Sequence, residues 1–209
     1  MRFARRASVL EISNLRGTKL GPIDLSLGAG ECVSVSGPSG AGKSLLLRAI
    51  ADLDPSEGSV RLDGVNRDDI PAPKWRGRVG YLPAESGWWA ERVGAHFLDS
   101  AHDKVRSLLD RLSLSGEAMD WDVGRLSTGE KQRLAFVRLL ECGPRVLLLD
   151  EPTSALDEET QGAVETIIHE LCAAGTGVIV VTHDNDQARR LSGRRLSILD
   201  GRLREEARP

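Results

Sequence analysis

The sequence predicts an α/β fold in which helices cover a mainly parallel sheet. Two continuous apolar runs, Val146–Asp150 and Gly177–His183, have the pattern of strands buried on both faces. Between them lies a helical stripe of apolar residues within Glu159–Ala174, formed by Val164, Ile167, Ile168 and Leu171. Strand, helix and strand in this order form the crossover connection from which parallel sheets are built.

The flanking segments predict an antiparallel edge and an inserted subdomain. Val9–Ile12 and Ile23–Leu27 alternate in polarity on either side of a glycine-containing turn, as antiparallel strands do. "ECVSVSG" predicts a strand that leads into a glycine-rich loop, "KSLLLRAIADL" an apolar helix, and "PSEGSVRLDG" a strand between two turns. From about Glu85 to Arg125 there is no β-type run, and "AHDKVRSLLDRLSL" reads as a helix. We therefore predict one domain over 1–209, with a core at about 1–84 and 126–209 and a small helical subdomain at about 85–125.

Composition narrows the classes of protein that are compatible with the chain. The 209 residues are 40% apolar and 28% charged, which is ordinary for a soluble globular domain. A net charge of −3 gives no argument for binding nucleic acid, which we therefore do not expect as a partner. Cys32, Cys142 and Cys172 contain no CxxC motif, so reduced thiols in a cytoplasmic protein are expected. No run approaches the ~18 apolar residues of a membrane span, so any membrane contact would go through another chain.

A phosphate-binding loop is predicted at Gly37–Ser44. "GPSGAGKS" fills every defined position of G-x-x-x-x-G-K-[ST], and it lies between a predicted strand and a predicted helix. The glycines let backbone N–H groups face a polyanion, and the start of the helix adds its positive end. Lys43 would reach the β- and γ-phosphates, and the Ser44 hydroxyl would bind Mg²⁺. The residues expected to bind ATP here are Gly37, Pro38, Ser39, Gly40, Ala41, Gly42, Lys43, Ser44 and Leu45.

A pair of carboxylates ends the buried run "VLLLDEP". Asp150 is expected to hold Mg²⁺, either directly or through water. Glu151 would then lie beside the γ-phosphate, where a carboxylate can orient an attacking water or accept its proton. A small P-loop kinase would not need this glutamate.

Three further motifs make the chain similar to one family. "LSTGEKQRLAFVR" (Leu126–Arg138) resembles the LSGGQ signature of ABC ATPases, "SALD" (Ser154–Asp157) their D-loop, and "VTHD" (Val181–Asp184) their switch-histidine region. Together with the phosphate loop and the acidic pair, these motifs follow the family order, and the resemblance covers essentially the whole chain. It implies a P-loop ABC-type ATPase that hydrolyses ATP to ADP and phosphate. The expected setting is a stand-alone bacterial or archaeal transporter subunit, peripheral on the inner face of the cell membrane.

The same resemblance assigns roles within a head-to-tail homodimer that encloses two ATP molecules. Ser127 and Gly129 would contact the γ-phosphate held by the partner, and Thr128 replaces the usual second glycine of the signature. Asp157 would contact the partner subunit. His183 would reach the γ-phosphate and hold it against Glu151. His96, His102 and His169 lack such a context and are expected to be ordinary.

Two departures from the family concern adenine and the loop "VGYLPAESGWWAERVG". No aromatic lies between Phe3 and Trp75 to stack on adenine, so we expect Arg16 to place its guanidinium over the ring. In "YLPAE", Ala84 replaces a glutamine that touches Mg²⁺ and water, and Glu85 is the nearest residue that offers a substitute oxygen.

The same loop carries a tryptophan pair. In the family, the segment after this loop receives the membrane subunit, so Trp88 and Trp89 are expected at that contact. Local packing within the helical subdomain is the alternative.

The function that the resemblance implies is the ATP-hydrolysing subunit of a membrane transporter, with ATP and Mg²⁺ as ligands. A soluble ABC ATPase with an assembly role, such as iron–sulfur cluster assembly, stays open as the alternative, while "LSTGEKQR" and "SALD" argue against a kinase. The run from the signature to "DEPTSALDEET" is similar to short subunits of an iron-export system. These stretches are shared widely in the family, so they define neither the cargo nor the direction of transport.

Overall fold

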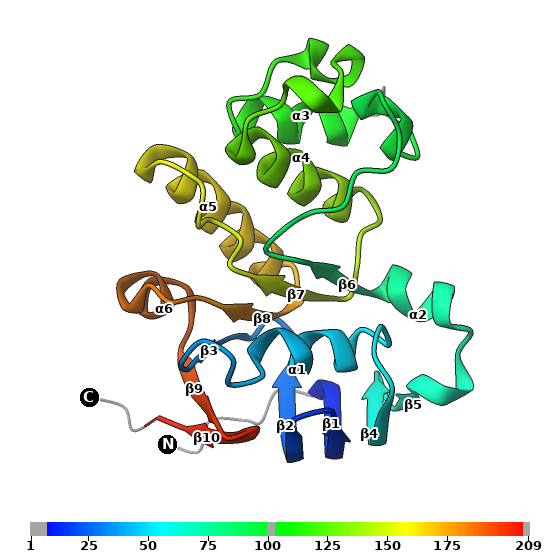
Figure 1. The fold of residues 1–209 in the computed structure, drawn as a ribbon, viewed down its shortest axis with the longest axis vertical. Coiled ribbons are helices and arrows are strands. Elements are labelled where there is room, and N and C mark those ends of the chain that lie inside the picture. The colour runs from blue at the N-terminus through cyan, green and yellow to red at the C-terminus, as the bar shows by residue number, and fades with distance from the viewer. Residues whose placement is uncertain (1–7, 100–102, 207–209) are drawn as a thin grey trace.

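The computed structural model describes residues 8–99 and 103–206, and it contains two sheets (Figure 1). The larger sheet has six strands in the order β10-β9-β3-β8-β7-β6. Its strands are β3 (Cys32–Ser36), β6 (Val79–Leu82), β7 (Val146–Asp150), β8 (Gly177–Val181), β9 (Arg194–Leu199) and β10 (Arg202–Glu205). All neighbours pair in parallel except β9 and β10, which confirms the predicted α/β class with a mainly parallel sheet.

The smaller sheet is the antiparallel edge. Its order is β2-β1-β4-β5, and its strands are β1 (Ser8–Gly17), β2 (Leu20–Gly28), β4 (Ser56–Leu62) and β5 (Val65–Asn66). In β2 the alternate residues Ile23, Leu25 and Leu27 face the core, so polarity alternates along the strand. In β1, irregularities of the pairing bury Val9 and Leu10 together and place Leu15 in the same core. Helix α1 (Lys43–Ile50) lies between this sheet and the larger one (Figure 1), and its apolar side chains belong to the same core.

The other helices cover the larger sheet or extend away from it. They are α2 (Ala72–Arg78), α3 (Asp103–Arg111), α4 (Thr128–Glu141), α5 (Glu158–Ala173) and α6 (Asn185–Leu191). A second core joins α4 and α5 to the opposite face of β7 and β8, and it continues into α3. Each of β7 and β8 therefore contacts apolar side chains on both faces, which explains their continuous apolar sequences.

The segment predicted as a helical subdomain contains one α-helix within the part that the structure describes. Around α3 the chain forms short 3₁₀ turns at Val93–His96, Gly116–Asp120 and Val123–Arg125, and a single β-bridge joins Arg92 to Asp122. The predicted helix over 101–114 begins for the described residues at Asp103 and ends at Arg111. Helix α4, which the sequence assigns to the core, packs against both α3 and β6 and so connects the two parts.

Candidate nucleotide site

The loop Gly37–Ser44 joins the end of β3 to the start of α1, as its motif requires. Gly37 and Gly42 have φ angles of 144° and 104°, a region that side chains disfavour. A Cβ at Gly37 would lie 2.4 Å from the carbonyl oxygen of Ile198, so only glycine fits against β9. Beside this loop is a cavity of about 400 Å³, lined by Pro38 to Ala41, Lys19 and the β9–β10 turn.

Lys43 folds back over the loop that precedes it. Its Nζ donates hydrogen bonds to the carbonyl oxygens of Gly37 (2.8 Å) and Pro38 (3.0 Å), and the side chain is buried. These bonds hold the ammonium group at the loop rather than in solvent. A cation held in this place can meet a phosphate without first having to be ordered.

The acidic pair lies at the carboxyl end of β7. Asp150 is 4% exposed, and its Oδ2 accepts a hydrogen bond from the Tyr81 hydroxyl on β6 (3.3 Å). Burial, followed by the charge of Asp150, raises the pKa of Tyr81, so this hydroxyl remains a donor. Asp150 is thus oriented by a neighbouring strand.

Glu151 faces His183. Its Oε1 lies 3.2 Å from Nε2 of His183, which follows the end of β8 and is exposed. Burial raises the pKa of the Glu151 carboxyl above its usual value, while His183 lowers it. Asp150 raises the same pKa and Lys43 lowers it, so all four groups share one electrostatic environment. The structure therefore brings the predicted base, switch histidine and metal ligand together near the phosphate-loop lysine.

The signature residues begin α4. The Ser127 hydroxyl accepts the Glu130 N–H (3.2 Å), and the Glu130 carboxylate accepts both the N–H and the hydroxyl of Ser127 (2.8 Å each). This is a complete capping box, and it lowers the pKa of Glu130. Ser127 is exposed, but in this state its hydroxyl is occupied by Glu130.

The D-loop aspartate also caps a helix. Asp157 accepts the N–H of Thr160 (2.9 Å) at the start of α5, which lowers the pKa of this exposed carboxyl. Gly129 comes close to the same loop, since a Cβ there would lie 3.0 Å from the carbonyl oxygen of Ala155. The signature and the D-loop are therefore adjacent within one chain.

The residues at which the sequence differs from the family pattern lie on the surface. Arg16 is exposed on β1, with its Nε donating to Asn14 Oδ1 (3.2 Å), and it does not line the cavity beside the phosphate loop. Ala84 and Glu85 are both exposed after β6.

Gln132 is a buried residue that the sequence patterns do not indicate, yet its amide forms hydrogen bonds with the backbone around Glu151. The only signal was its position, one helical turn before the buried Phe136 in α4.

The tryptophan pair lies in an irregular segment that side chains hold in place. Trp89 is 73% exposed and Trp88 is partly buried, and the Arg138 guanidinium lies over both rings at 4.9 and 4.7 Å. His96, which is buried, accepts the N–H groups of Trp89 and Ala90 at Nε2 (2.9 and 3.0 Å). His96 is therefore structural, and His169 is exposed on α5, whereas His102 lies outside the described residues.

The phosphate loop and the acidic pair together define the class of protein. A glycine-rich loop between a parallel strand and a helix, with an acidic pair at the end of a second buried strand, is the arrangement of a P-loop nucleotide-binding domain. The sequence profile of the family described as "ABC transporter" matches residues 20–154. The chain belongs to the ABC transporter family, and its domain is of the ABC ATPase type.

Curated relatives agree with this assignment. The chain is 38% identical over 205 residues to the macrolide export ATP-binding/permease protein MacB of Bordetella avium, which covers 90% of this chain and 31% of the relative. It is 38% identical over 203 residues to the Fe(3+) ions import ATP-binding protein FbpC of Streptomyces avermitilis, covering 91% of this chain and 58% of the relative. The chain thus spans about a third to three fifths of the length of these relatives.

Solved structures share the fold. A dimeric ATP-binding cassette in a post-hydrolysis state, bound to ADP and Pi, is similar with a TM-score of 0.81 at 26% identity, covering 94% of this chain and 97% of the other. A bacterial Atm1-family ABC exporter with ATP bound is similar with a TM-score of 0.82 at 26% identity, covering 94% of this chain and 38% of the other.

Proposed function

We propose that the chain binds and hydrolyses ATP for a membrane ABC transporter, working as a head-to-tail homodimer with a separate membrane subunit. The observation that carries this proposal is the pairing of Glu151 with His183 at the ends of two buried strands, in one electrostatic environment with Lys43 and Asp150. A protein that only binds ATP would need the phosphate loop and Lys43, but it would not need a carboxylate next to them.

The residues divide the chemistry of hydrolysis between them. The phosphate loop from Gly37 to Leu45 would bind the triphosphate, with Lys43 neutralising charge that develops on it. Glu151 would orient the attacking water and accept its proton, for which a raised pKa is suitable. His183 would hold the γ-phosphate on the other side, and its exposure leaves the ring free to turn towards it.

The donor set fits Mg²⁺ that is bound together with its nucleotide. Ser44 follows Lys43 at the start of α1, and Asp150 is a buried carboxylate, so these two residues would hold the ion. Among the described residues there is no group of three acidic, histidine or cysteine side chains that could hold a metal. The remaining ligands would be phosphate oxygens and water, as Mg²⁺ prefers. The bound ion supplies charge neutralisation on the phosphates.

The dimer would complete each site with groups from the other chain. Ser127 is exposed and Gly129 is partly exposed at the start of α4, and Asp157 is exposed in the neighbouring loop, so all three can face a partner. For Ser127 to donate to a phosphate, its hydroxyl would have to leave Glu130. ATP binding and dimer closure would then be coupled to the opening of the capping box.

The membrane subunit would dock at Trp88 and Trp89. Trp89 is largely exposed, and the guanidinium group of Arg138 lies against its ring. Tryptophan and arginine are frequent anchors of protein interfaces. No helix among the described residues is both long and apolar enough to cross a bilayer. We place the chain peripherally on the cytoplasmic face of the membrane, with this patch towards the partner.

The proposal does not extend to a cargo. The names of the relatives include macrolide export, iron import and phosphate import at similar identity.

Two residue assignments belong to the proposed function. Arg16 would cover adenine, and an Arg16→Ala variant with unchanged ATP affinity would contradict this. Glu85 would replace the missing glutamine at Ala84, and normal hydrolysis by Glu85→Ala would contradict that role.

The test is phosphate release from ATP by the purified chain, with Lys43→Ala as the variant and Lys74→Ala as the control. Lys74 is exposed on α2, away from the phosphate loop. We expect hydrolysis by the wild type and by Lys74→Ala, and loss of ATP binding in Lys43→Ala. Co-purification of a polytopic membrane protein would support the transporter assignment. Stable association with a soluble assembly factor instead would overturn it.

A further inference from the structure

The backbone that carries Glu151 is held from two sides. Glu151 has a φ of 51°, a left-handed conformation that a non-glycine residue keeps only when its surroundings impose it. Its N–H donates to the carbonyl oxygen of Val181 on β8 (3.0 Å), and its own carbonyl oxygen accepts the side-chain amide of Gln132 (2.7 Å). One partner comes from the sheet and the other comes from α4, the helix that the signature begins.

Gln132 contacts the loop that follows Glu151 at more than one point. Its Nε2 also lies 3.4 Å from Ser154 Oγ, and its Oε1 accepts the N–H of Ala155 (3.2 Å). The residue is 5% exposed, so these bonds are not shared with bulk water. A buried amide that is satisfied on both its oxygen and its nitrogen is a rigid link, because breaking either bond leaves an unpaired polar group.

Packing ties the start of α4 to the same loop. The backbone at Gly129 comes so close to Ala155 that a Cβ would lie 3.0 Å from its carbonyl oxygen. From the other side, the Gln187 amide on α6 donates to Thr153 Oγ1 (2.7 Å). The residues from Glu151 to Ala155 therefore cannot shift relative to α4 without breaking the bonds of Gln132.

We infer that Gln132 is a positioning residue that sets the orientation of Glu151 according to the position of α4. The inference rests on the proposed function. Ser127 and Gly129 would act on the ATP held by the partner, whereas Glu151 would act on the ATP held by this chain. Movement of α4 on contacting the partner's phosphate would reach Glu151 through Gln132.

The test uses two substitutions that divide the bonds of Gln132. Gln132→Leu removes both the donor and the acceptor. Gln132→Glu keeps the size and still accepts the Ala155 N–H, but once ionised its carboxylate has no proton to donate to Glu151. Because burial raises the pKa of such a carboxyl, kcat is compared with that of the wild type over a pH range that extends to about 9.5. Thr166→Val is the control, since its hydroxyl donates to the Gly162 carbonyl oxygen within α5 (2.9 Å) and not to the loop.

We expect both Gln132 variants to lower kcat at least ten-fold while the Kd for ATP changes less than two-fold, and Thr166→Val to change neither. Exchange of the Ala155 amide hydrogen should accelerate in Gln132→Leu but stay slow in Gln132→Glu. A kcat within two-fold of wild type in either folded Gln132 variant overturns the inference. If Gln132→Leu does not fold, the Gln132→Glu variant decides the question. If the wild type does not hydrolyse ATP, the proposed function fails instead.

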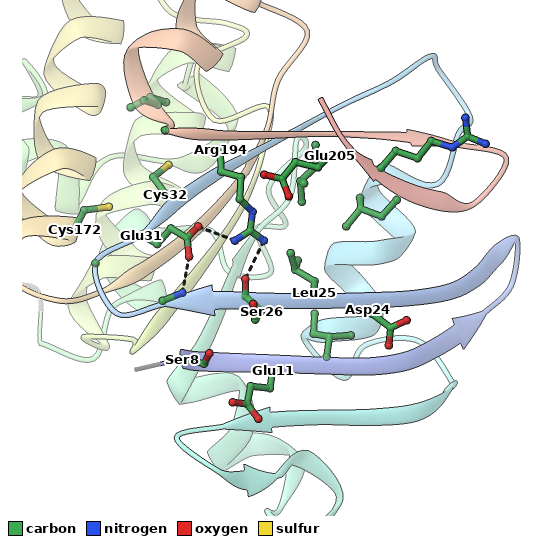
Figure 2. A pocket seen from close by; sticks show the side chains of 18 of the residues that line it. Ser8, Glu11, Asp24, Leu25, Ser26, Glu31, Cys32, Cys172, Arg194 and Glu205 are labelled. Atoms are coloured by element: carbon green, nitrogen blue, oxygen red, sulfur yellow. Dashed lines mark hydrogen bonds and ion pairs between the residues drawn. The ribbon is translucent and has the colours of Figure 1, made fainter. Parts of the chain in front are cut away.

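The large groove of about 1200 Å³ between β1–β2 and β9–β10 (Figure 2) carries no comparable inference. Two of its charged side chains, Arg194 and Glu31, form an ion pair (2.8 Å).

Discussion

The nucleotide site and the tryptophan segment are built in opposite ways. In the nucleotide site, the reactive side chains follow directly from the ends of β3, β7 and β8, so the sheet itself determines where they lie. Between β6 and α3 the described residues form one 3₁₀ turn and one β-bridge, and side chains such as His96 and Arg138 hold the backbone. The first arrangement suits a ligand with a constant triphosphate. The second suits a partner whose surface differs from one protein to another.

The strongest test of this contrast removes the base from the nucleotide site. Glu151→Gln keeps the shape of the side chain but cannot accept a proton, so kcat should fall by roughly 100- to 10,000-fold. ATP binding and binding of the membrane partner should both be retained. Phosphate release and nucleotide affinity measure the two effects separately, and a kcat near that of the wild type would show that Glu151 is not the base.

A second test removes the aromatic anchors. Trp88→Ala with Trp89→Ala should weaken binding of the membrane partner by about 30-fold, as expected for interface anchors worth about 2 kcal/mol. The affinity for ATP should not change. Trp121→Ala is the matched control, because Trp121 also lies under an arginine, Arg125 (4.1 Å), within the same subdomain. Equal loss of ATP and partner binding would indicate a folding role for the pair.

A third test loosens the tryptophan segment without touching its rings. His96→Ala leaves the N–H groups of Trp89 and Ala90 without their protein acceptor. Hydrogen exchange at these two amides should accelerate, while kcat of the isolated chain stays within two-fold. A fall in kcat would show that the nucleotide site depends on the conformation of the tryptophan segment, which would contradict the contrast between the two regions.

The smallest effect concerns the stability of the nucleotide site. The raised pKa of Glu151 means that the folded state holds its proton to a higher pH than the unfolded state does. Stability from this group is therefore lost as pH rises from the unfolded pKa through the folded pKa. The free energy of unfolding of Glu151→Gln minus that of the wild type should increase over this range and then level off. A difference that is independent of pH would contradict the shift.

The same contrast explains what the sequence predicts well. Buried parallel strands are continuous apolar runs, so β7, β8 and the residues after them were placed correctly, and the range 159–174 matches α5 within one residue at each end. Sequence patterns do not report long-range side-chain bonds. The engagement of Ser127 with Glu130, the bond from Tyr81 to Asp150 and the role of Gln132 therefore emerge only from the structure.

The segment with Trp88 and Trp89 was the hardest part to predict for a related reason. Adjacent tryptophans fit neither a helical stripe nor an alternating strand, and in the structure both rings lie against the same His96 and Arg138. Trp88 is partly buried, while Trp89 is exposed. Its contact with a membrane subunit stays a prediction.

The most direct test of the central claim is the mass of the Glu151→Gln chain in solution with ATP and Mg²⁺, measured by light scattering together with its nucleotide content. The proposed function predicts a dimer that holds two ATP molecules, and a monomer when ADP replaces ATP. Adding Ser127→Arg, which places a bulky side chain at the start of α4, should prevent the dimer while each chain still binds ATP. A Glu151→Gln chain that binds ATP fully and remains monomeric would contradict the claim that two chains share the site.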